Sequence, residues 1–149
     1  MMNCVSVKVK KLREGAVIPA FGTEFSAGAD LYSAEDGDTE IAPGETKIVH
    51  TGIAVEIPAG YCGIIAARSS VATKRGLAPA NKIGVIDSDY RGELMTAVFN
   101  QSKEVQCIAR GERFAQLLIV PYLFAEFTEC DELSETERGE GGFGSTGKK

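Results

Sequence analysis

The stretch GIAVEIPAGYCGIIAARSS, residues 52–70, carries the pattern that decides the fold. Apolar side chains occupy every second position of residues 53–57, which is typical of a β-strand with one buried face. A Pro-Ala-Gly turn follows at residues 58–60, and residues 61–67 form a second short apolar run. That run stops abruptly at residues 68–70, so the second predicted strand ends in one cation and two hydroxyl groups.

Short strands separated by turns recur along the rest of the chain. Residues 5–10 alternate in the same way, and further strand candidates lie at residues 94–99, 105–109 and 115–120. Strands of this length and spacing predict an all-β protein, either a barrel or a sandwich. Only residues 69–75 resemble a helix, and that helix is short.

The composition is that of one ordinary globular domain. The 149 residues are 44% hydrophobic and 25% charged, and the net charge of −5 argues against nonspecific binding to nucleic acid or to an anionic membrane. No apolar run is long enough to predict a transmembrane helix. The composition changes once, after Cys130, so we expect a β domain over residues 1–130 and a flexible C-terminal arm over residues 131–149.

Cysteine and histidine usage argues against several kinds of chemistry. The four cysteines lie far apart and form no C-x-x-C pair, which argues against a zinc site and favours reduced thiols in a cytoplasmic protein. His50 is the only histidine, which nearly removes Ser-His-Asp and Cys-His catalysis from consideration. Any reaction must use carboxylates, arginines and hydroxyls.

Polar residues that are unusual in a β protein gather in five short segments, at residues 27–31, 67–70, 84–92, 111–117 and 138–149. Arg68, Ser69 and Ser70 suit phosphate binding, because a guanidinium, hydroxyls and helix N–H groups converge there. The same residues could instead begin a capped helix that carries a surface arginine.

The other carboxylate and amide positions are equally open when each is taken alone. Asp87 follows two β-branched residues and suits a general base at the edge of a pocket, but it also suits the start of a turn. Gln116 lies in an apolar run and points either inward with a hydrogen bond or outward. Asp30 either holds a metal through water or caps a turn.

The last segment, RGEGGFGSTGKK, superficially fits a phosphate-binding loop. Residues 142–148 match its first seven positions, but Lys149 stands where the loop needs Ser or Thr, and no strand or helix flanks it. A solvated tail is the simpler interpretation. A lone aromatic residue, Phe143, and the Gly-Ser-Thr-Gly run after it nevertheless suggest an anion-binding surface.

In this order and spacing, the five segments resemble the five motifs of the trimeric deoxyuridine triphosphate nucleotidohydrolase (dUTPase) family. The most specific parts are GVIDSDYRGEL, residues 84–94, and RGEGGFGSTG, residues 138–147. The resemblance implies a jelly-roll-like β barrel that forms a homotrimer, with each active site shared between subunits. The tail would be the mobile arm that closes over the bound nucleotide.

The resemblance also implies the reaction. The family hydrolyses dUTP to dUMP and pyrophosphate with Mg2+, which limits uracil in DNA and supplies dUMP for dTMP synthesis. Asp87 would deprotonate the water that attacks the α-phosphorus. The triphosphate would hold most of the Mg2+ coordination, with Asp30 in the outer shell through water.

The substrate contacts follow in the same way from the matching positions. Phosphate would be bound by Arg68, Ser69, Ser70 and Gln116. Uracil would be read by Asn81 and by backbone groups of Gly84, Val85 and Ile86, while Tyr90 would lie under the deoxyribose. The arm would add Arg138, Gly144, Ser145 and Thr146 at the terminal phosphate, and Phe143 would stack on the uracil.

Two positions depart from the family pattern, and two rival functions follow from it. Relatives often carry Pro before the motif arginine and Gly after its serine, where this chain has Ala67 and Ser70. A dCTP deaminase of the same fold is one rival, although the DSDYRG sequence after Ile86 is the hydrolase form. A catalytically silent nucleotide-binding module is the other.

Overall fold

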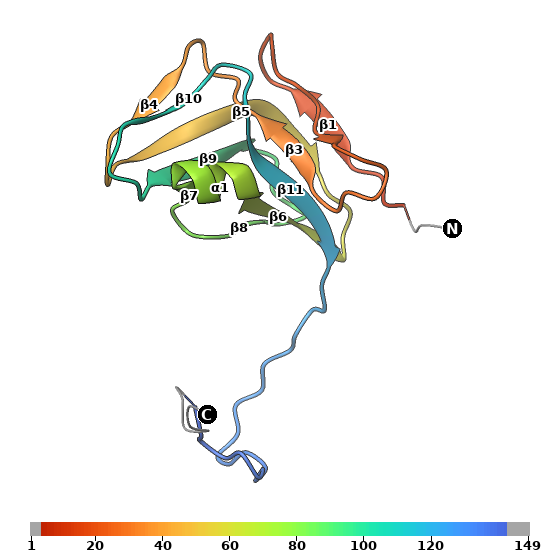
Figure 1. Ribbon diagram of the computed structural model, residues 1–149. Coiled ribbons are helices and arrows are strands. Elements are labelled where there is room, and N and C mark those ends of the chain that lie inside the picture. The colour runs from red at the N-terminus through yellow and green to blue at the C-terminus, as the bar shows by residue number, and fades with distance from the viewer. Residues whose placement is uncertain (1–3, 143–149) are drawn as a thin grey trace.

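The computed structural model describes residues 4–142, which form eleven strands and one short helix (Figure 1). All strand pairs are antiparallel, and they are arranged in three sheets. The four-stranded sheet has the order β1 (Lys8–Lys11), β5 (Thr46–Glu56), β9 (Glu93–Asn100), β7 (Leu77–Pro79). The five-stranded sheet has the order β2 (Ala20–Phe21), β3 (Ala29–Tyr32), β11 (Arg113–Pro121), β6 (Tyr61–Ala67), β8 (Gly84–Ile86). Strands β10 (Gln106–Ile108) and β4 (Thr39–Ile41) form a small third sheet.

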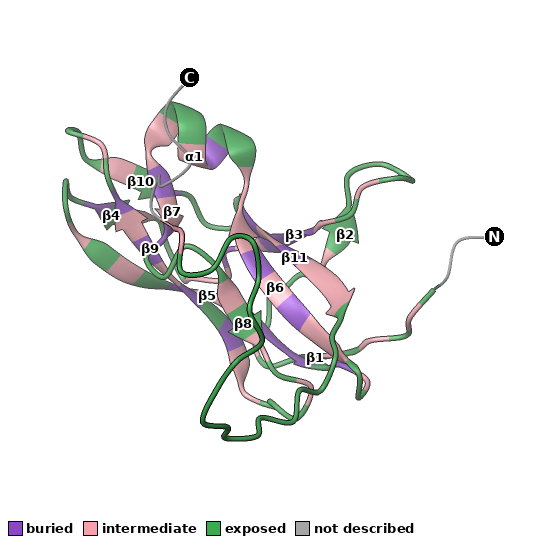
Figure 2. Cartoon of the chain, turned by 90° about the horizontal axis from the view of Figure 1, so that it is seen from below, coloured by how far each residue is buried: buried purple, intermediate pink, exposed green. Residues whose placement is uncertain are grey.

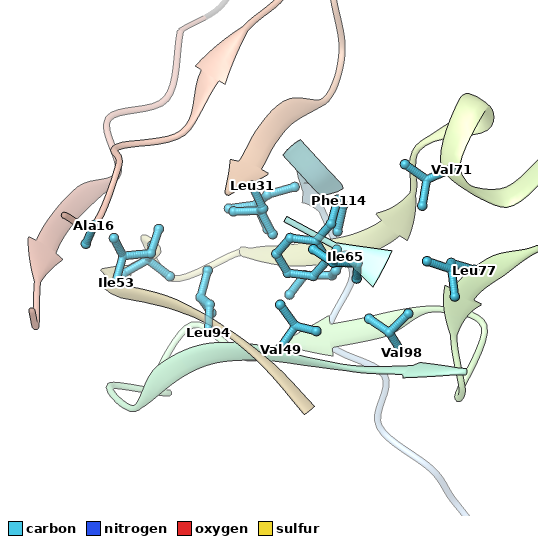
Figure 3. Packing of buried hydrophobic residues seen from close by; sticks show 14 of the residues in the cluster. Ala16, Leu31, Val49, Ile53, Ile65, Val71, Leu77, Leu94, Val98 and Phe114 are labelled. Atoms are coloured by element: carbon cyan, nitrogen blue, oxygen red, sulfur yellow. The ribbon is translucent and has the colours of Figure 1, made fainter. Parts of the chain in front are cut away.

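The hydrophobic core lies between the two larger sheets. Val49, Leu94 and Val98 of the four-stranded sheet face Leu31, Ile65 and Phe114 of the five-stranded sheet (Figure 3). Alternate residues along β9 are buried, as the side-chain period of two requires when one face of a strand is covered. The two sheets therefore pack face to face, in the manner of a jelly roll. The expected all-β fold with a single short helix is confirmed, although the described residues form three open sheets and not one closed ring of strands.

Strand β5 differs from simple alternation at its centre. Residues 51–55 are all buried, because the ladder to β9 is interrupted by a register shift between His50 and Ala54 and the N-terminal segment covers this point. Gly52 lies in the shift with φ +68°, and a Cβ there would stand 2.8 Å from Cγ of Arg13 and 2.9 Å from Cβ of Ala16. Only glycine suits both this backbone conformation and this close approach.

The predicted strands and helix fall close to their observed positions. The run at residues 61–67 is β6, and the helix α1 (Ser69–Arg75) has the predicted bounds. The helix ends at Gly76, which has φ 68° and donates its N–H to the carbonyls of Ala72 and Val71. The first strand begins at Lys8, three residues later than the alternation from Val5 indicated.

The chain leaves the sheets after β11. Residues 122–142 contain neither strand nor helix, and in Figure 1 they run away from the body of the domain. Residues 121–140 are exposed throughout (Figure 2, green), including large apolar side chains: Leu123, Phe124, Phe127 and Leu133. The last strand ends at Pro121, and the domain boundary expected after Cys130 stays a prediction.

Truncation of a core side chain is expected to show how much the packing between the sheets contributes to the free energy of unfolding. Ile108→Ala removes a fully buried side chain and should lower the free energy of unfolding by about 2–5 kcal/mol. Ile18→Ala removes the same atoms at a position that is 52% exposed, and should change it by less than about 0.5 kcal/mol. Urea denaturation at one fixed protein concentration, followed by circular dichroism, gives both values. Equal losses would contradict the placement of Ile108 in the core.

Candidate active site

A polar cavity opens where β6 ends and α1 begins. Its volume is about 480 Å³, and its lining includes eight residues of the first, second and fourth polar segments: Ala27, Gly28, Asp30, Arg68, Ser69, Ser70, Arg113 and Gln116. Strand β11 brings the segments together, because it pairs with β3 on one side and β6 on the other. Gln116 is the Cα partner of both Asp30 and Ala66. The expected phosphate-binding side chains therefore share one cavity.

Asp30 lies at the back of this cavity between two guanidinium groups. Its side chain is only 11% exposed, with Nε of Arg68 at 2.8 Å from one oxygen and an NH1 of Arg113 at 3.1 Å from the other. Arg68 also donates to the backbone carbonyl of Arg113 at 3.1 Å. These bonds fix the plane of the Arg68 guanidinium and leave its remaining N–H groups for a ligand. Arg68 is thus held by a buried carboxylate, unlike the free surface arginine of the simpler interpretation.

The arginine at position 113 was not singled out from the sequence. It lies in the fourth polar segment, three residues before Gln116, and the proximity to Asp30 arises from the pairing of β11 with β3. Its side chain is half exposed and lines the cavity. One Asp30 oxygen accepts from Arg68 and the other needs a second donor, but the sequence does not show which arginine provides it.

The Gln116 side chain is held at the end of β6 and fills the space beside Gly28. Its Nε2 donates to the backbone carbonyl of Ala67 at 2.9 Å. A Cβ built at Gly28 would lie 2.5 Å from Oε1 of Gln116. Any larger residue at position 28 would displace the amide, which explains the Ala-Gly-x-Asp sequence of this segment in physical terms.

A second, smaller pocket of about 160 Å³ lies at the β8–β9 connection. Its lining consists of Val85, Ile86, Asp87, Tyr90, Glu93 and Met95. Asp87 is exposed directly after β8, and its carbonyl accepts the N–H of Tyr90 at 3.1 Å to close a turn. Asp87 therefore begins a turn and also lines a pocket, and its role as a general base stays a prediction.

The ring of Tyr90 is packed against a glycine and anchored at its tip. The hydroxyl donates to the backbone carbonyl of Glu93 at 3.0 Å. A Cβ at Gly92 would lie 2.5 Å from Cζ of the ring, so only glycine permits this orientation. The Arg91 guanidinium donates to the carbonyls of Ser88 and Tyr90 at 2.7 and 2.9 Å. These two bonds stabilise the turn that contains Arg91.

The Glu93 carboxylate joins this turn to strand β5 and to the N-terminal segment. It accepts from the backbone N–H of Gly52 at 2.7 Å, and it lies 3.0 Å from Nδ1 of His50 and 3.3 Å from NH2 of Arg13. Burial alone would raise the pKa of the Glu93 carboxyl, but the hydrogen bonds from His50 and Gly52 and the charge of Arg13 together hold it below its ordinary value. Glu93 was not singled out from the sequence either.

The two pockets are separate within one chain. Ile86 pairs with Gly63 near the start of β6, whereas Arg68 follows the end of that strand. Five residues of extended strand separate Gly63 from Arg68 by about 17 Å, which is several times the reach of a hydrogen bond. Asp87 and the cluster around Arg68 are therefore not brought together by the fold of a single chain.

The remaining expected site residues are less constrained. Asn81 is exposed in the turn before β8, near Gly84. Arg138 is exposed, and its Nε donates to the carbonyl of Gly141 at 2.9 Å. Phe143, Gly144, Ser145 and Thr146 lie outside the described residues. Within residues 4–142, no group of three or more His, Cys, Asp or Glu side chains could hold a metal ion, and no helix is long and apolar enough to cross a membrane.

The depressed pKa of Glu93 predicts how its contribution to stability depends on pH. Because the folded-state pKa lies below the ordinary value of 4.5, the charged carboxylate stabilises the fold at any pH above that value. This contribution is lost as the pH falls through the depressed pKa. Wild type should therefore unfold with a higher free energy than Glu93→Gln at pH 7, and the difference should shrink below pH 4.5. Urea denaturation of both proteins across pH 3–7 gives the comparison, and a constant difference would contradict the role of the charge.

Comparison with known proteins agrees with this geometry along nearly the whole chain. The dUTPase family model matches residues 14–147. A deoxyuridine 5'-triphosphate nucleotidohydrolase from Nautilia profundicola is 50% identical over 144 residues, covering 97% of this chain and 100% of the relative. A dUTPase mutant from Staphylococcus bacteriophage 80alpha, solved with dUpNHpp, has a TM-score of 0.85 at 33% identity and covers 95% of this chain and 98% of its own.

A further solved structure concerns a metal. A mutant dUTPase from phage phi11 of S. aureus, which coordinates a structural Mg(II) ion, has a TM-score of 0.76 at 29% identity and covers 85% of this chain and 97% of its own. The sequence identity, the matched span and the shared arrangement of strands agree with one another. On these grounds the chain belongs to the dUTPase family.

Proposed function

We propose that this protein hydrolyses dUTP to dUMP and pyrophosphate with Mg2+, limiting uracil in DNA and supplying dUMP for dTMP synthesis. The observation that carries the proposal is the pair of half-sites: a cavity lined by arginine, hydroxyl and amide groups, and a pocket beside a carboxylate and a tyrosine ring. The first suits a triphosphate and the second a nucleoside. Membership of the dUTPase family supports the same assignment.

The cavity at the end of β6 supplies donors for phosphate oxygens. Arg68 presents a planar guanidinium whose orientation is fixed by Asp30, and the Ser69 and Ser70 hydroxyls line the same cavity. Gln116 contributes an amide that is held by the carbonyl of Ala67. The two departures from the family pattern do not oppose this role, since Ala67 still accepts the Gln116 bond and Ser70 adds a hydroxyl donor.

Uracil is proposed to bind at the free edge of β8. This strand is the last in its sheet and pairs only with β6, so the backbone N–H and C=O groups on its other edge have no strand partner among the described residues. Uracil offers a donor and acceptors that backbone groups of Gly84, Val85 and Ile86 can satisfy, with Asn81 nearby. Cytosine presents the opposite pattern at N3 and C4, so a slot of this kind rejects it by about 10⁴-fold.

The sugar and the reacting water are assigned to the turn after β8. Tyr90 lies under the deoxyribose and leaves no space for a 2′-hydroxyl. Asp87 accepts a proton from the water that attacks the α-phosphorus, a contribution worth about 10²–10⁴ in rate. The P–O bond to the bridging oxygen breaks, and pyrophosphate leaves while dUMP retains the new P–O bond.

The residues present fit a magnesium ion that the substrate carries. Mg2+ keeps several water ligands and binds substrate phosphates, so it needs no cluster of carboxylates. When bound, it would neutralise charge on the triphosphate. Asp30 lines the phosphate cavity, and both of its oxygens already accept from guanidinium groups, which favours contact with a hydrated ion through water over direct ligation.

A homotrimer is proposed to bring the half-sites of different copies together. The separation of Asp87 from Arg68 within one chain supports this, because one nucleotide must reach both. Large apolar side chains on the surface support it as well. Ile48 and Met95 are exposed on the outer face of the β5–β9 ladder, and Leu123, Phe124 and Phe127 are more than nine-tenths exposed after β11. Exposed apolar surface of this extent is typical of a protein interface.

The C-terminal arm, residues 131–149, is proposed to close over the bound nucleotide. Arg138, Gly144, Ser145 and Thr146 would bind the terminal phosphate, and Phe143 would cover the uracil. The exposure of residues 131–140 supports this role, because closure of an exposed segment breaks little packing. A cytoplasmic location stays a prediction from the cysteine pattern.

A substrate panel tests the proposed function. Purified protein is incubated with Mg2+ and with dUTP, dCTP, dTTP or UTP separately, and pyrophosphate and ammonia are measured. Pyrophosphate should form from dUTP at a rate at least about 10²-fold above each of the others, because both base and sugar are read. Ammonia from dCTP would identify a deaminase, and binding of dUTP without turnover would identify a silent module.

Mixing two inactive variants tests the shared site. Asp87→Asn and Arg68→Ala should each lose activity, the first by at least about 10²-fold in kcat, whereas Asp36→Asn, on an exposed turn, should not. Trimers formed by co-refolding both inactive variants should recover about a quarter of wild-type activity, because random assembly pairs the two intact half-sites in about one site in four. Light scattering should give three chains per particle. No recovery from a particle that contains both variants would show that each site is built within one chain.

A further inference from the structure

We infer that Glu93 is a positioning residue that sets the selectivity for deoxyribose over ribose by holding the Tyr90 ring in place. The inference rests on the proposed function, because it assigns a discriminating role to Tyr90. Glu93 itself is not required to touch the substrate. It acts at both of its ends, through its backbone carbonyl on Tyr90 and through its carboxylate on the strands behind the pocket.

The Tyr90 side chain depends on residue 93 for its position. Its hydroxyl donates to the Glu93 carbonyl at 3.0 Å, and the structure gives it no other hydrogen bond among the described residues. The residue is 40% exposed, so packing covers only part of the ring. Gly92 permits the ring to lie close to the backbone but has no side chain to brace it. A shift of the Glu93 carbonyl would therefore be transmitted directly to the ring.

The Glu93 carboxylate fills a gap in the β5–β9 ladder. The register shifts between His50 and Ala54, so regular backbone pairing is lost where β9 begins. Two side chains replace the missing bonds: the Glu93 carboxylate accepts from Gly52 N–H at 2.7 Å, and the Thr51 hydroxyl donates to the Leu94 carbonyl at 2.7 Å. Glu93 thus fixes its own backbone by bonding across the interruption.

The N-terminal segment locks this arrangement from the other side. Arg13 places its guanidinium 3.3 Å from the Glu93 carboxylate and donates to the Ala34 carbonyl, while Leu12 N–H bonds to the Gly52 carbonyl at 2.8 Å. His50 adds a contact of 3.0 Å to the same carboxylate. With its side chain only 16% exposed, the Glu93 carboxylate is held by three partners from two segments, Arg13 of the N-terminal segment and His50 and Gly52 of β5. A site element must be held within about 0.5 Å to discriminate well, and this network supplies that constraint.

The experiment compares dUTP and UTP as substrates. Wild type, Glu93→Gln, Glu93→Ala and Tyr90→Phe are assayed for kcat/KM on both nucleotides, with the double variant Glu93→Ala/Tyr90→Phe. Glu56→Gln is the matched control, because Glu56 is an exposed β5 carboxylate paired with Lys8 and lies outside both pockets. Circular dichroism melting and light scattering confirm that each variant is folded and assembled.

Glu93→Ala is expected to lower the dUTP/UTP ratio of kcat/KM about tenfold or more, because a ring displaced by even 1 Å no longer excludes the 2′-hydroxyl. Glu93→Gln should lower it less, since an amide oxygen can still accept from Gly52. Tyr90→Phe should lower the ratio too, and the double variant should add little, as for residues that act through one another. Glu56→Gln should match wild type.

Two results would overturn the inference: an unchanged dUTP/UTP ratio in Glu93→Ala, which includes equal losses on both nucleotides, or additive losses in the double variant. A Glu93→Ala protein that fails to fold leaves Glu93→Gln and Tyr90→Phe to decide the same question. Failure of the wild type to hydrolyse dUTP would overturn the proposed function itself, and this result is distinct from hydrolysis with an unchanged ratio among the variants.

Discussion

The length of strand β6 is the constraint on which the organisation of the site depends. The strand pairs with β11 along all of residues 61–67 and with β8 at residues 63–65, so it cannot bend to bring its ends together. Near its start, Gly63 pairs with Ile86 of the smaller pocket, and the polar cavity opens directly after its last residue. Because the strand holds the two pockets apart, the proposed function needs more than one copy of the chain to bring them together on one nucleotide.

Strand β11 determines which side chains meet in the polar cavity. It lies in the middle of its sheet and pairs with segments that are far apart in the sequence. The pairing with β3 fixes the position of Asp30, and the pairing with β6 fixes that of Arg68. Missing side chains are as important here as those present. A side chain at position 28 would collide with Gln116, and a side chain at position 92 would collide with the Tyr90 ring, so both positions require glycine. Each glycine is explained by the neighbour that it accommodates, and each would be misread as a flexible loop position without that neighbour.

The sequence predicted local features well and long-range ones poorly. The strands at 61–67, 94–99 and 115–120 and the helix were evident from periodicity and turn residues, because those signals depend on near neighbours. Arg68, Gln116 and Asp87 were recognised as candidate site residues through their motifs. Arg113 and Glu93 were not, since their partners Asp30 and Arg13 lie 83 and 80 residues away. A charge pair of that separation becomes visible only when the pairing of the strands is known.

Strand β8 carries a consequence for the behaviour of the protein in concentrated solution. It is a sheet edge whose outer backbone groups have no strand partner among the described residues. Ile83, just before it, and Val85, within it, are 54% and 61% exposed, a combination that ordinarily favours the addition of strands from other chains. Here the edge is only three residues long, and Lys82 precedes it with φ 68°, which breaks the extended conformation. An edge this short can satisfy the few groups of a single base, but it is too short to template the growth of an aggregate.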